Sequence, residues 1–206
     1  MSEADPLVLI VSGPSGSGKS TLVEKILELP EVLRSVSCTT RAPRKTESRS
    51  KCYNFVSEAA FQQMVERGEF LEYARVFGKN WYGTPRKWLD EARERNLSLV
   101  LEIDVQGAQQ VKDQLPSAVM IFVLPPSMQD LVGRLRARGQ DAEDEIQRRL
   151  NRARDEMLKY RNYDYAVVND DVARAGREIQ AIAVASRCRM ARNENRIREI
   201  LKSFGG

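Results

Sequence analysis

The chain opens with a short apolar run that is followed by apolar positions at helical spacing. Residues 7–11 read Leu-Val-Leu-Ile-Val, an unbroken run that is typical of a buried strand. Between residues 20 and 29 the apolar positions recur every three or four residues, which predicts an amphipathic helix that Pro30 ends. We therefore expect a strand, a glycine-rich turn and a helix at the start of the chain.

Apolar runs and helical segments continue to alternate along the rest of the chain. We expect further strands at residues 35–40, 97–103, 118–124 and 165–168. Capping and stop signals predict helices at residues 58–67, 86–95, 128–138, 141–160 and from 172 towards 202. This alternation predicts an α/β fold, a mainly parallel sheet with helices on both faces.

Two segments fit that sheet poorly, so we expect one domain with two inserted parts. Residues 37–95 carry short mixed elements, and residues 134–154 hold seven arginines in 21 positions. We interpret the first as an acceptor-binding lobe and the second as a helical lid, although arginine-rich helices are more often solvated faces. The expected division is a core of residues 5–36, 96–133 and 155–185, a lobe of 37–95, a lid of 134–154 and a tail of 186–206.

Composition removes several kinds of chemistry. The chain contains no histidine, which excludes Ser–His and Cys–His catalysis and histidine-ligated metals. Its three cysteines show no C-x-x-C pair and favour reduced thiols. No run of about 20 apolar residues and no apolar signal core is present, so we expect a cytoplasmic protein without membrane contact.

The net charge of +4 comes from the end of the chain. Residues 186–206 hold six basic and two acidic side chains, and the first 185 residues are neutral, with 27 of each sign. A balanced body argues against a specific nucleic-acid partner, and the basic tail is most simply a solvated last helix. The oligomeric state stays open.

The turn after the first strand carries the strongest motif. Residues 13–20 match G-x-x-x-x-G-K-[ST], in which backbone N–H groups cradle phosphates at a helix N-terminus. Such turns can also be simple helix caps, but the strand before and the helix after supply the context of a P-loop NTPase-type sheet. Lys19 would reach the β- and γ-phosphates of ATP, and the Ser20 hydroxyl would hold Mg²⁺. The expected ATP-binding residues here are Gly13, Pro14, Ser15, Gly16, Ser17, Gly18, Lys19, Ser20 and Thr21.

Five spaced motifs together resemble the guanylate kinase family over roughly residues 7 to 185. They are the phosphate loop, Ser35 to Arg44, Tyr53-Asn-Phe55 with Phe70-Leu-Glu72, Trp81-Tyr82-Gly83-Thr84, and Ile103-Asp104-Val-Gln-Gly107. The resemblance implies that the lobe binds GMP. Its phosphate would be held by Arg41, Arg44, Tyr53 and Tyr82, and its guanine by Ser37, Glu72, Thr84 and Asp104.

The chemistry of these side chains agrees with the implied roles. Guanidinium forks pair with phosphate oxygens, and phenolic hydroxyls add neutral donors. The Glu72 carboxylate can accept from both N1–H and the exocyclic amine of guanine, donors that adenine lacks at those positions. Taken alone, Glu72 would more often be a surface charge.

The resemblance also assigns the lid and the adenine side. Lid arginines matching Arg134, Arg138 and Arg149 would close over the triphosphate and act in catalysis with Lys19 and Arg44. Asn169 matches a position near the adenine of ATP, although Asn169-Asp-Asp can also be a strand-end turn with a helix cap. Two departures stand out: residues 45–52 lack the usual glycines, and Glu102 replaces an Asp that orients magnesium-bound water.

The sequence thus predicts a Mg²⁺-dependent enzyme that transfers the γ-phosphoryl group of ATP to GMP, and to dGMP, without a covalent intermediate. Two alternatives remain at this point. One is a non-catalytic guanylate-kinase-like interaction module. The other is a kinase for a different nucleoside monophosphate or for a sugar phosphate.

Overall fold

The computed structural model describes residues 5–43, 53–76, 78–137 and 143–204. Its core is a sheet of five parallel strands, which confirms the predicted α/β architecture. In spatial order these strands are β2 (Val32–Arg34), β7 (Ser98–Glu102), β1 (Val8–Ser12), β8 (Val119–Leu124) and β9 (Tyr165–Val168). The first strand of the chain is therefore central, and its carboxyl end lies between those of β7 and β8.

Helices cover both faces of this sheet because alternate residues of its strands point to opposite sides. Leu9 and Val11 face α1 (Lys19–Leu27) and α7 (Val172–Arg187). Val8 and Ile10 face α3 (Lys87–Glu94) and α4 (Val105–Gln114). Each layer holds a cluster of buried apolar residues, as expected for parallel strands buried on both faces.

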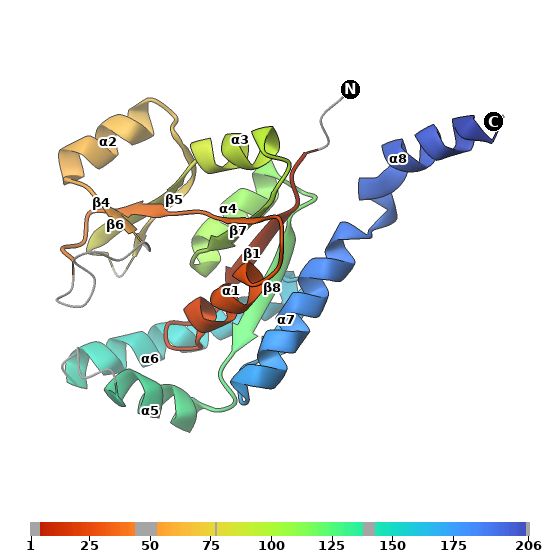
Figure 1. Cartoon of the computed structure of the whole chain (residues 1–206). Coiled ribbons are helices and arrows are strands. Elements are labelled where there is room, and N and C mark those ends of the chain that lie inside the picture. The colour runs from red at the N-terminus through yellow and green to blue at the C-terminus, as the bar shows by residue number, and fades with distance from the viewer. Residues whose placement is uncertain (1–4, 44–52, 77, 138–142, 205–206) are drawn as a thin grey trace.

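The lobe and the lid project from the same side of the core sheet (Figure 1). The lobe is a four-stranded sheet with one covering helix, and the lid consists of two helices. The lobe elements are β4 (Tyr53–Phe55), β3 (Ser37–Thr39), β6 (Asn80–Pro85), β5 (Phe70–Val76) and α2 (Glu58–Glu66). The lid helices are α5 (Met128–Ala137) and α6 (Glu143–Met157), and a 3-10 turn, η1 (Leu158–Asn162), returns the chain to β9.

Two element boundaries differ from expectation. We expected the lobe to extend to residue 95, but α3 buries Leu89 and Ala92 against the core sheet. We also expected one long last helix, and the chain instead forms α7 and then α8 (Met190–Ser203). Asn193 Nδ2 bonds the carbonyl oxygens of Arg187 and Arg189 at 2.9 and 3.1 Å, which satisfies backbone groups at the break.

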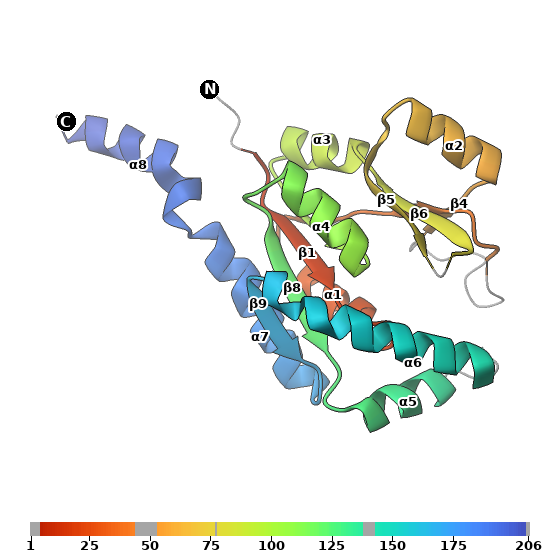
Figure 2. The same ribbon diagram turned by 180° about the vertical axis from the view of Figure 1, so that it is seen from behind.

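Helix α8 extends away from the body (Figure 2), and none of its residues is buried. It carries four of the six basic residues and both acidic residues of the tail, so half of the net charge of +4 lies on this helix. Within the described residues, no helix combines the length and apolar character that crossing a membrane requires.

Candidate active site

A cleft of about 510 Å³ lies between the phosphate loop, the lobe and α6. The carboxyl ends of β1 and β7 lead directly into it, the usual place for a ligand site in a parallel sheet. The sequence assigned residues 13–20, the lobe and the lid to one reaction, and the fold brings all three to this cleft. Most of the predicted residues line it: Gly13, Ser15, Gly16, Gly18, Lys19, Ser20, Ser37, Arg41, Tyr53, Glu72, Tyr82, Glu102, Asp104 and Arg149.

The phosphate loop has a backbone that requires glycine at its two ends. Gly13 and Gly18 have φ values of 135° and 91°, in the left-handed range that other residues rarely adopt. A Cβ atom at Gly13 would lie 2.3 Å from the Val123 carbonyl oxygen. Gly18 is also the N-cap of α1 and offers no capping side chain, so the loop leads into a helix start suited to an anion.

Lys19 lies folded over its own loop. Its ammonium donates to the carbonyl oxygens of Gly13 and Pro14, at 2.7 and 3.0 Å. The positive charge is thereby held at the mouth of the loop, where the phosphates of a nucleotide would bind. Thr21, two residues after Lys19 in α1, is exposed and does not line the cleft.

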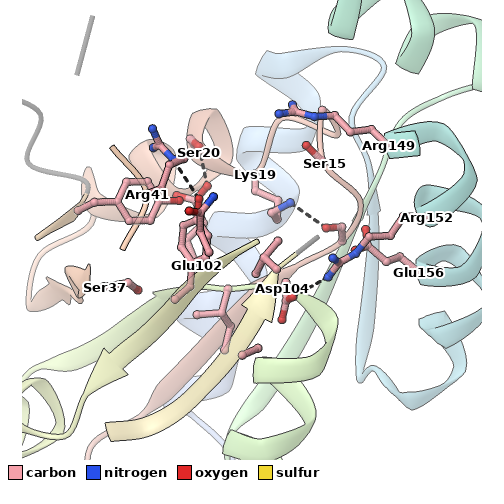
Figure 3. A pocket seen from close by; sticks show the side chains of 18 of the residues that line it. Ser15, Lys19, Ser20, Ser37, Arg41, Glu102, Asp104, Arg149, Arg152 and Glu156 are labelled. Carbon is pink, nitrogen blue, oxygen red and sulfur yellow. Dashed lines mark hydrogen bonds and ion pairs between the residues drawn. The ribbon is translucent and has the colours of Figure 1, made fainter. Parts of the chain in front are cut away.

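Ser20 and Glu102 form a small oxygen cluster beside Lys19 (Figure 3). The Ser20 hydroxyl donates to Glu102 Oε1 across 2.5 Å, and Arg34 donates to Glu102 Oε2 at 3.0 Å. A hydroxyl and a carboxylate are hard oxygen ligands of the kind that Mg²⁺ prefers. In the described part of the chain no three acidic, cysteine or histidine side chains gather to hold a metal. The donor set therefore fits an ion that takes its remaining ligands from phosphates and water.

Arg134 and Asn169 both hold the backbone of the phosphate loop. Arg134 Nη1 and Asn169 Nδ2 donate to the Ser17 carbonyl oxygen at 3.2 and 2.8 Å. Arg134 Nη2 also donates to the Asn169 carbonyl oxygen at 2.6 Å. Asn169 is buried, and among the described residues its Oδ1 has no hydrogen-bond partner. The structure thus places the two residues behind the loop, where they fix its shape.

The lobe presents a guanidinium held by aromatic rings. Arg41 Nε donates to the Tyr82 hydroxyl at 3.0 Å, and the guanidinium lies 5.7 and 5.6 Å from the ring centroids of Tyr53 and Phe55. Arg41 Nη1 also donates to the Ala42 carbonyl oxygen at 2.8 Å. The predicted anion-binding residues Arg41, Tyr53 and Tyr82 therefore meet in one place. Arg44 and the unusual loop of residues 45–52 lie outside the described residues.

A buried chain of hydroxyls and one carboxylate lies deeper in the lobe. Thr84 donates to Glu72 Oε1 at 2.7 Å, and the hydroxyls of Ser37 and Thr84 are 3.2 Å apart. All three side chains are buried. Burial raises the pKa of Glu72 to about 7, although the Thr84 hydrogen bond opposes the shift. This carboxylate is therefore poised to gain or lose a proton near neutral pH.

Asp104 links the core to the lid. Its Oδ1 caps α4 by accepting from the backbone N–H groups of Gln106 and Gly107, at 3.0 and 2.9 Å. Its Oδ2 accepts from Arg152 Nη2 at 2.9 Å, and Arg152 Nε donates to Glu156 Oε1 at 2.7 Å (Figure 3). Burial raises the pKa of Glu156, and its bond to Arg152 works against that rise.

The lid contributes further charges at the mouth of the cleft. Arg149 lines the cleft with Nε 3.9 Å from Glu145 Oε1. Lys79, between β5 and β6, reaches the same carboxylate from the lobe, with 3.4 Å between Nζ and Oε2. The ion pair between Lys79 and Glu145 thus connects the lobe with the lid. The third predicted lid arginine, Arg138, lies outside the described residues.

Sequence reasoning missed five charged residues that line this cleft, namely Arg34, Lys79, Glu145, Arg152 and Glu156. A signal existed for three of them. Glu145 precedes Arg149 by four positions, and Arg152 and Glu156 follow it by three and seven, which places all four on one face of a helix. Arg34 and Lys79 come from segments without a motif, so only the fold brings them to the cleft.

Comparisons with known proteins agree with this geometry. Residues 5–185 match the family model described as "Guanylate kinase". A "Guanylate kinase" of Myxococcus xanthus is 48% identical over 188 residues, covering 90% of either chain, and one of Caldanaerobacter subterraneus is 44% identical over 190 residues, covering 92% of either. The crystal structure of guanylate kinase from Anaplasma phagocytophilum has a TM-score of 0.80, is 34% identical and covers 98% of this chain and 97% of its own.

Proposed function

The chain belongs to the guanylate kinase family, and on that premise we propose which residues of the cleft bind the phosphoryl donor and which bind the acceptor. It is an ATP-dependent nucleoside monophosphate kinase that transfers the γ-phosphoryl group of ATP to GMP, giving ADP and GDP. The intact glycine loop and the charged cleft argue against the non-catalytic alternative. We propose that dGMP is a second acceptor and that the reaction takes place in the cytoplasm.

The donor half of the cleft is the phosphate loop with its supports. Backbone N–H groups of residues 13–18 bind the triphosphate, and Lys19 leaves the carbonyl oxygens of its own loop to contact the β- and γ-phosphates. Ser20 and Glu102 are the residues that would hold Mg²⁺, which supplies charge neutralisation for the phosphates when bound. Asn169 and Arg134 keep the loop in shape from behind, and Asn169 also borders the adenine side.

The acceptor half is the lobe, and one observation carries the assignment to guanine. The buried carboxylate of Glu72 lies in the same cleft as the phosphate loop. It accepts a hydrogen bond from the Thr84 hydroxyl, which in turn contacts the hydroxyl of Ser37. When ionised it accepts from guanine N1–H and the exocyclic amine. Adenine supplies neither donor at these positions, so its binding would leave a buried charge unpaired.

The reaction itself needs alignment more than proton transfer. The attacking GMP phosphate is already an anion at neutral pH, so no general base is required. Arg41, Tyr53 and Tyr82 hold that phosphate, with Arg44 in the same role, while Arg149 and Arg138 of the lid neutralise the charge of the moving phosphoryl group.

A panel of acceptors tests the proposal. ADP formation from Mg²⁺-ATP is measured with GMP, dGMP, AMP, UMP, CMP and dTMP in turn. We expect GMP to have the highest kcat/KM, followed by dGMP, with the other acceptors lower by about 10⁴-fold. Equal turnover of AMP and GMP would overturn the assignment of Glu72 to guanine and favour the alternative of another monophosphate kinase.

A further inference from the structure

Gly107, in the first turn of α4, lies directly against the carboxylate of Glu72. A Cβ atom built on Gly107 would lie 2.3 Å from Glu72 Oε2 and 2.8 Å from Glu72 Cδ. Glu72 Cγ, at 3.4 Å, is the next nearest atom. All three atoms belong to Glu72, so a side chain at position 107 would compete with this one carboxylate for space.

The backbone of α4 gives no other reason for a glycine at this position. Gly107 lies inside a regular helix and is not among the glycines with positive φ, so alanine could adopt its conformation. Glycine destabilises a helix interior relative to alanine. The Gly107 N–H is used as well, because it donates to Asp104 Oδ1 at 2.9 Å. What Gly107 provides is therefore the absence of a side chain.

We propose that Gly107 is a positioning residue for guanine recognition, because its missing side chain lets the Glu72 carboxylate lie between Thr84 and α4. The inference rests on the proposed role of Glu72. Thr84 holds Oε1 from one side, and Gly107 admits Oε2 on the other. A methyl group at position 107 displaces the carboxylate from this place. The two oxygens of Glu72 then no longer point at the guanine donors.

The displacement affects binding of the acceptor more than folding. The atoms that must move are the far end of a side chain, and no backbone atom lies among the three nearest contacts. Burial already disfavours the ionised form of this carboxylate and raises its pKa to about 7. A carboxylate moved away from Thr84 loses the hydrogen bond that favours its ionised form.

Gly107→Ala tests the inference, with Gly133→Ala as the matched control. Gly133 lies in α5, is exposed and has nothing within 4 Å of a built Cβ. We expect Gly107→Ala to raise the KM for GMP at least tenfold and to leave the KM for ATP within twofold. Gly133→Ala should change neither value by more than twofold. A KM for GMP within twofold of the parent in Gly107→Ala would overturn the inference.

Two further variants separate this inference from the proposal on which it rests. If Glu72→Gln leaves the preference for GMP over AMP unchanged, the guanine assignment itself fails. If Glu72→Gln abolishes that preference and Gly107→Ala does not weaken it, only the role of Gly107 fails.

A double variant covers the case in which Gly107→Ala does not fold. With Glu72→Ala the competing carboxylate is gone, so adding Gly107→Ala should leave the circular dichroism spectrum and the KM for GMP as they are in Glu72→Ala alone. A further loss of either in the double variant would show that the methyl group disturbs something other than Glu72, and would overturn the inference.

Discussion

The hydroxyl of Ser20 and the carboxylate of Glu102 are joined by a 2.5 Å hydrogen bond, although 82 positions separate them in the chain. The bond connects the first turn of α1 to the end of β7. Glu102 also pairs with Arg34 at 3.0 Å, so its two oxygens have different partners.

Replacing Glu102 should therefore change the magnesium requirement. Glu102→Gln keeps the size of the side chain but removes the charge that helps to hold the ion, so we expect half-maximal activity to need about tenfold more free Mg²⁺. The measurement is turnover at fixed ATP and GMP over a magnesium titration. Glu24→Gln, which removes a different carboxylate that also pairs with Arg34, is the control and should leave the titration unchanged. An unaltered titration in Glu102→Gln would remove this residue from the metal site.

Lys19→Ala should abolish most of the turnover and keep the fold. The ammonium contacts carbonyl oxygens of the phosphate loop, and its loss removes positive charge where the γ-phosphoryl group moves. We expect kcat to fall by about 10²-fold or more, by analogy with other transition-state donors. Circular dichroism and GMP binding should stay unchanged. Lys25→Ala, on the same helix, is the control, and retained activity in Lys19→Ala would exclude Lys19 from the mechanism.

The raised pKa of Glu72 predicts a pH-dependent KM for GMP. With a pKa of about 7, the fraction of Glu72 that is ionised falls about tenfold between pH 8 and pH 6, and only the ionised form accepts both guanine donors. We expect the KM for GMP to rise about tenfold over that range, measured at saturating Mg²⁺-ATP.

The phosphate of GMP also titrates near pH 6, so a control is needed. Glu72→Gln keeps the phosphate contribution and removes that of the carboxylate, and its KM should vary less over the same range. Equal pH profiles in the two proteins would contradict the prediction. For stability the sign is opposite: the folded pKa lies above the usual 4.5, so the contribution of Glu72 to stability is fully present below pH 4.5 and is lost as the pH rises through about 7.

Arg152→Ala should destabilise the protein in a pH-dependent way. The change deprives Glu156, which is only 8% exposed, of its hydrogen bond and ion pair with Arg152, at an expected cost of about 1–3 kcal/mol in the free energy of unfolding. Removal of Arg152 raises the pKa of Glu156 further, so protonation at acidic pH relieves the cost. Urea unfolding at pH 8 and pH 5 should therefore show the larger loss at pH 8.

Arg148→Ala is the matched control for that change. Arg148 lies on the same helix, and its ion pair with Glu145 has an exposed guanidinium, so we expect less than about 0.5 kcal/mol at either pH. If Arg152→Ala lost no more stability than Arg148→Ala, the bonds of Arg152 to Asp104 and Glu156 would not matter for the fold.

Local signals were sufficient for the core of this fold. The apolar run before the phosphate loop became β1, and the helix expected at residues 58–67 became α2, which Ser57 caps by accepting from the N–H of Ala60. The formation of these elements depends on residues that are close in sequence, so an apolar run or a capping signal is enough to predict them. The candidate acceptor residues came from the family motifs, because spacing alone could not show that Glu72, Thr84 and Ser37 are linked by hydrogen bonds.

Other features depend on contacts that no local pattern records. Arg152 and Asp104 are 48 positions apart, and they form an ion pair because the fold places α6 beside the N-terminus of α4. The break between α7 and α8 has neither glycine nor proline, and it is marked instead by the side chain of Asn193. The contact of Gly107 with Glu72 likewise required the two segments to be placed together.

The bond from Asn169 to the carbonyl oxygen of Ser17 also bears on how the protein is made. Ser17 emerges from the ribosome early, and its partner follows 152 positions later, after the last strand of the core sheet. A nascent chain thus carries its nucleotide loop without this restraint through most of synthesis. Any chain that ends before Asn169 therefore lacks this hydrogen bond to the phosphate loop.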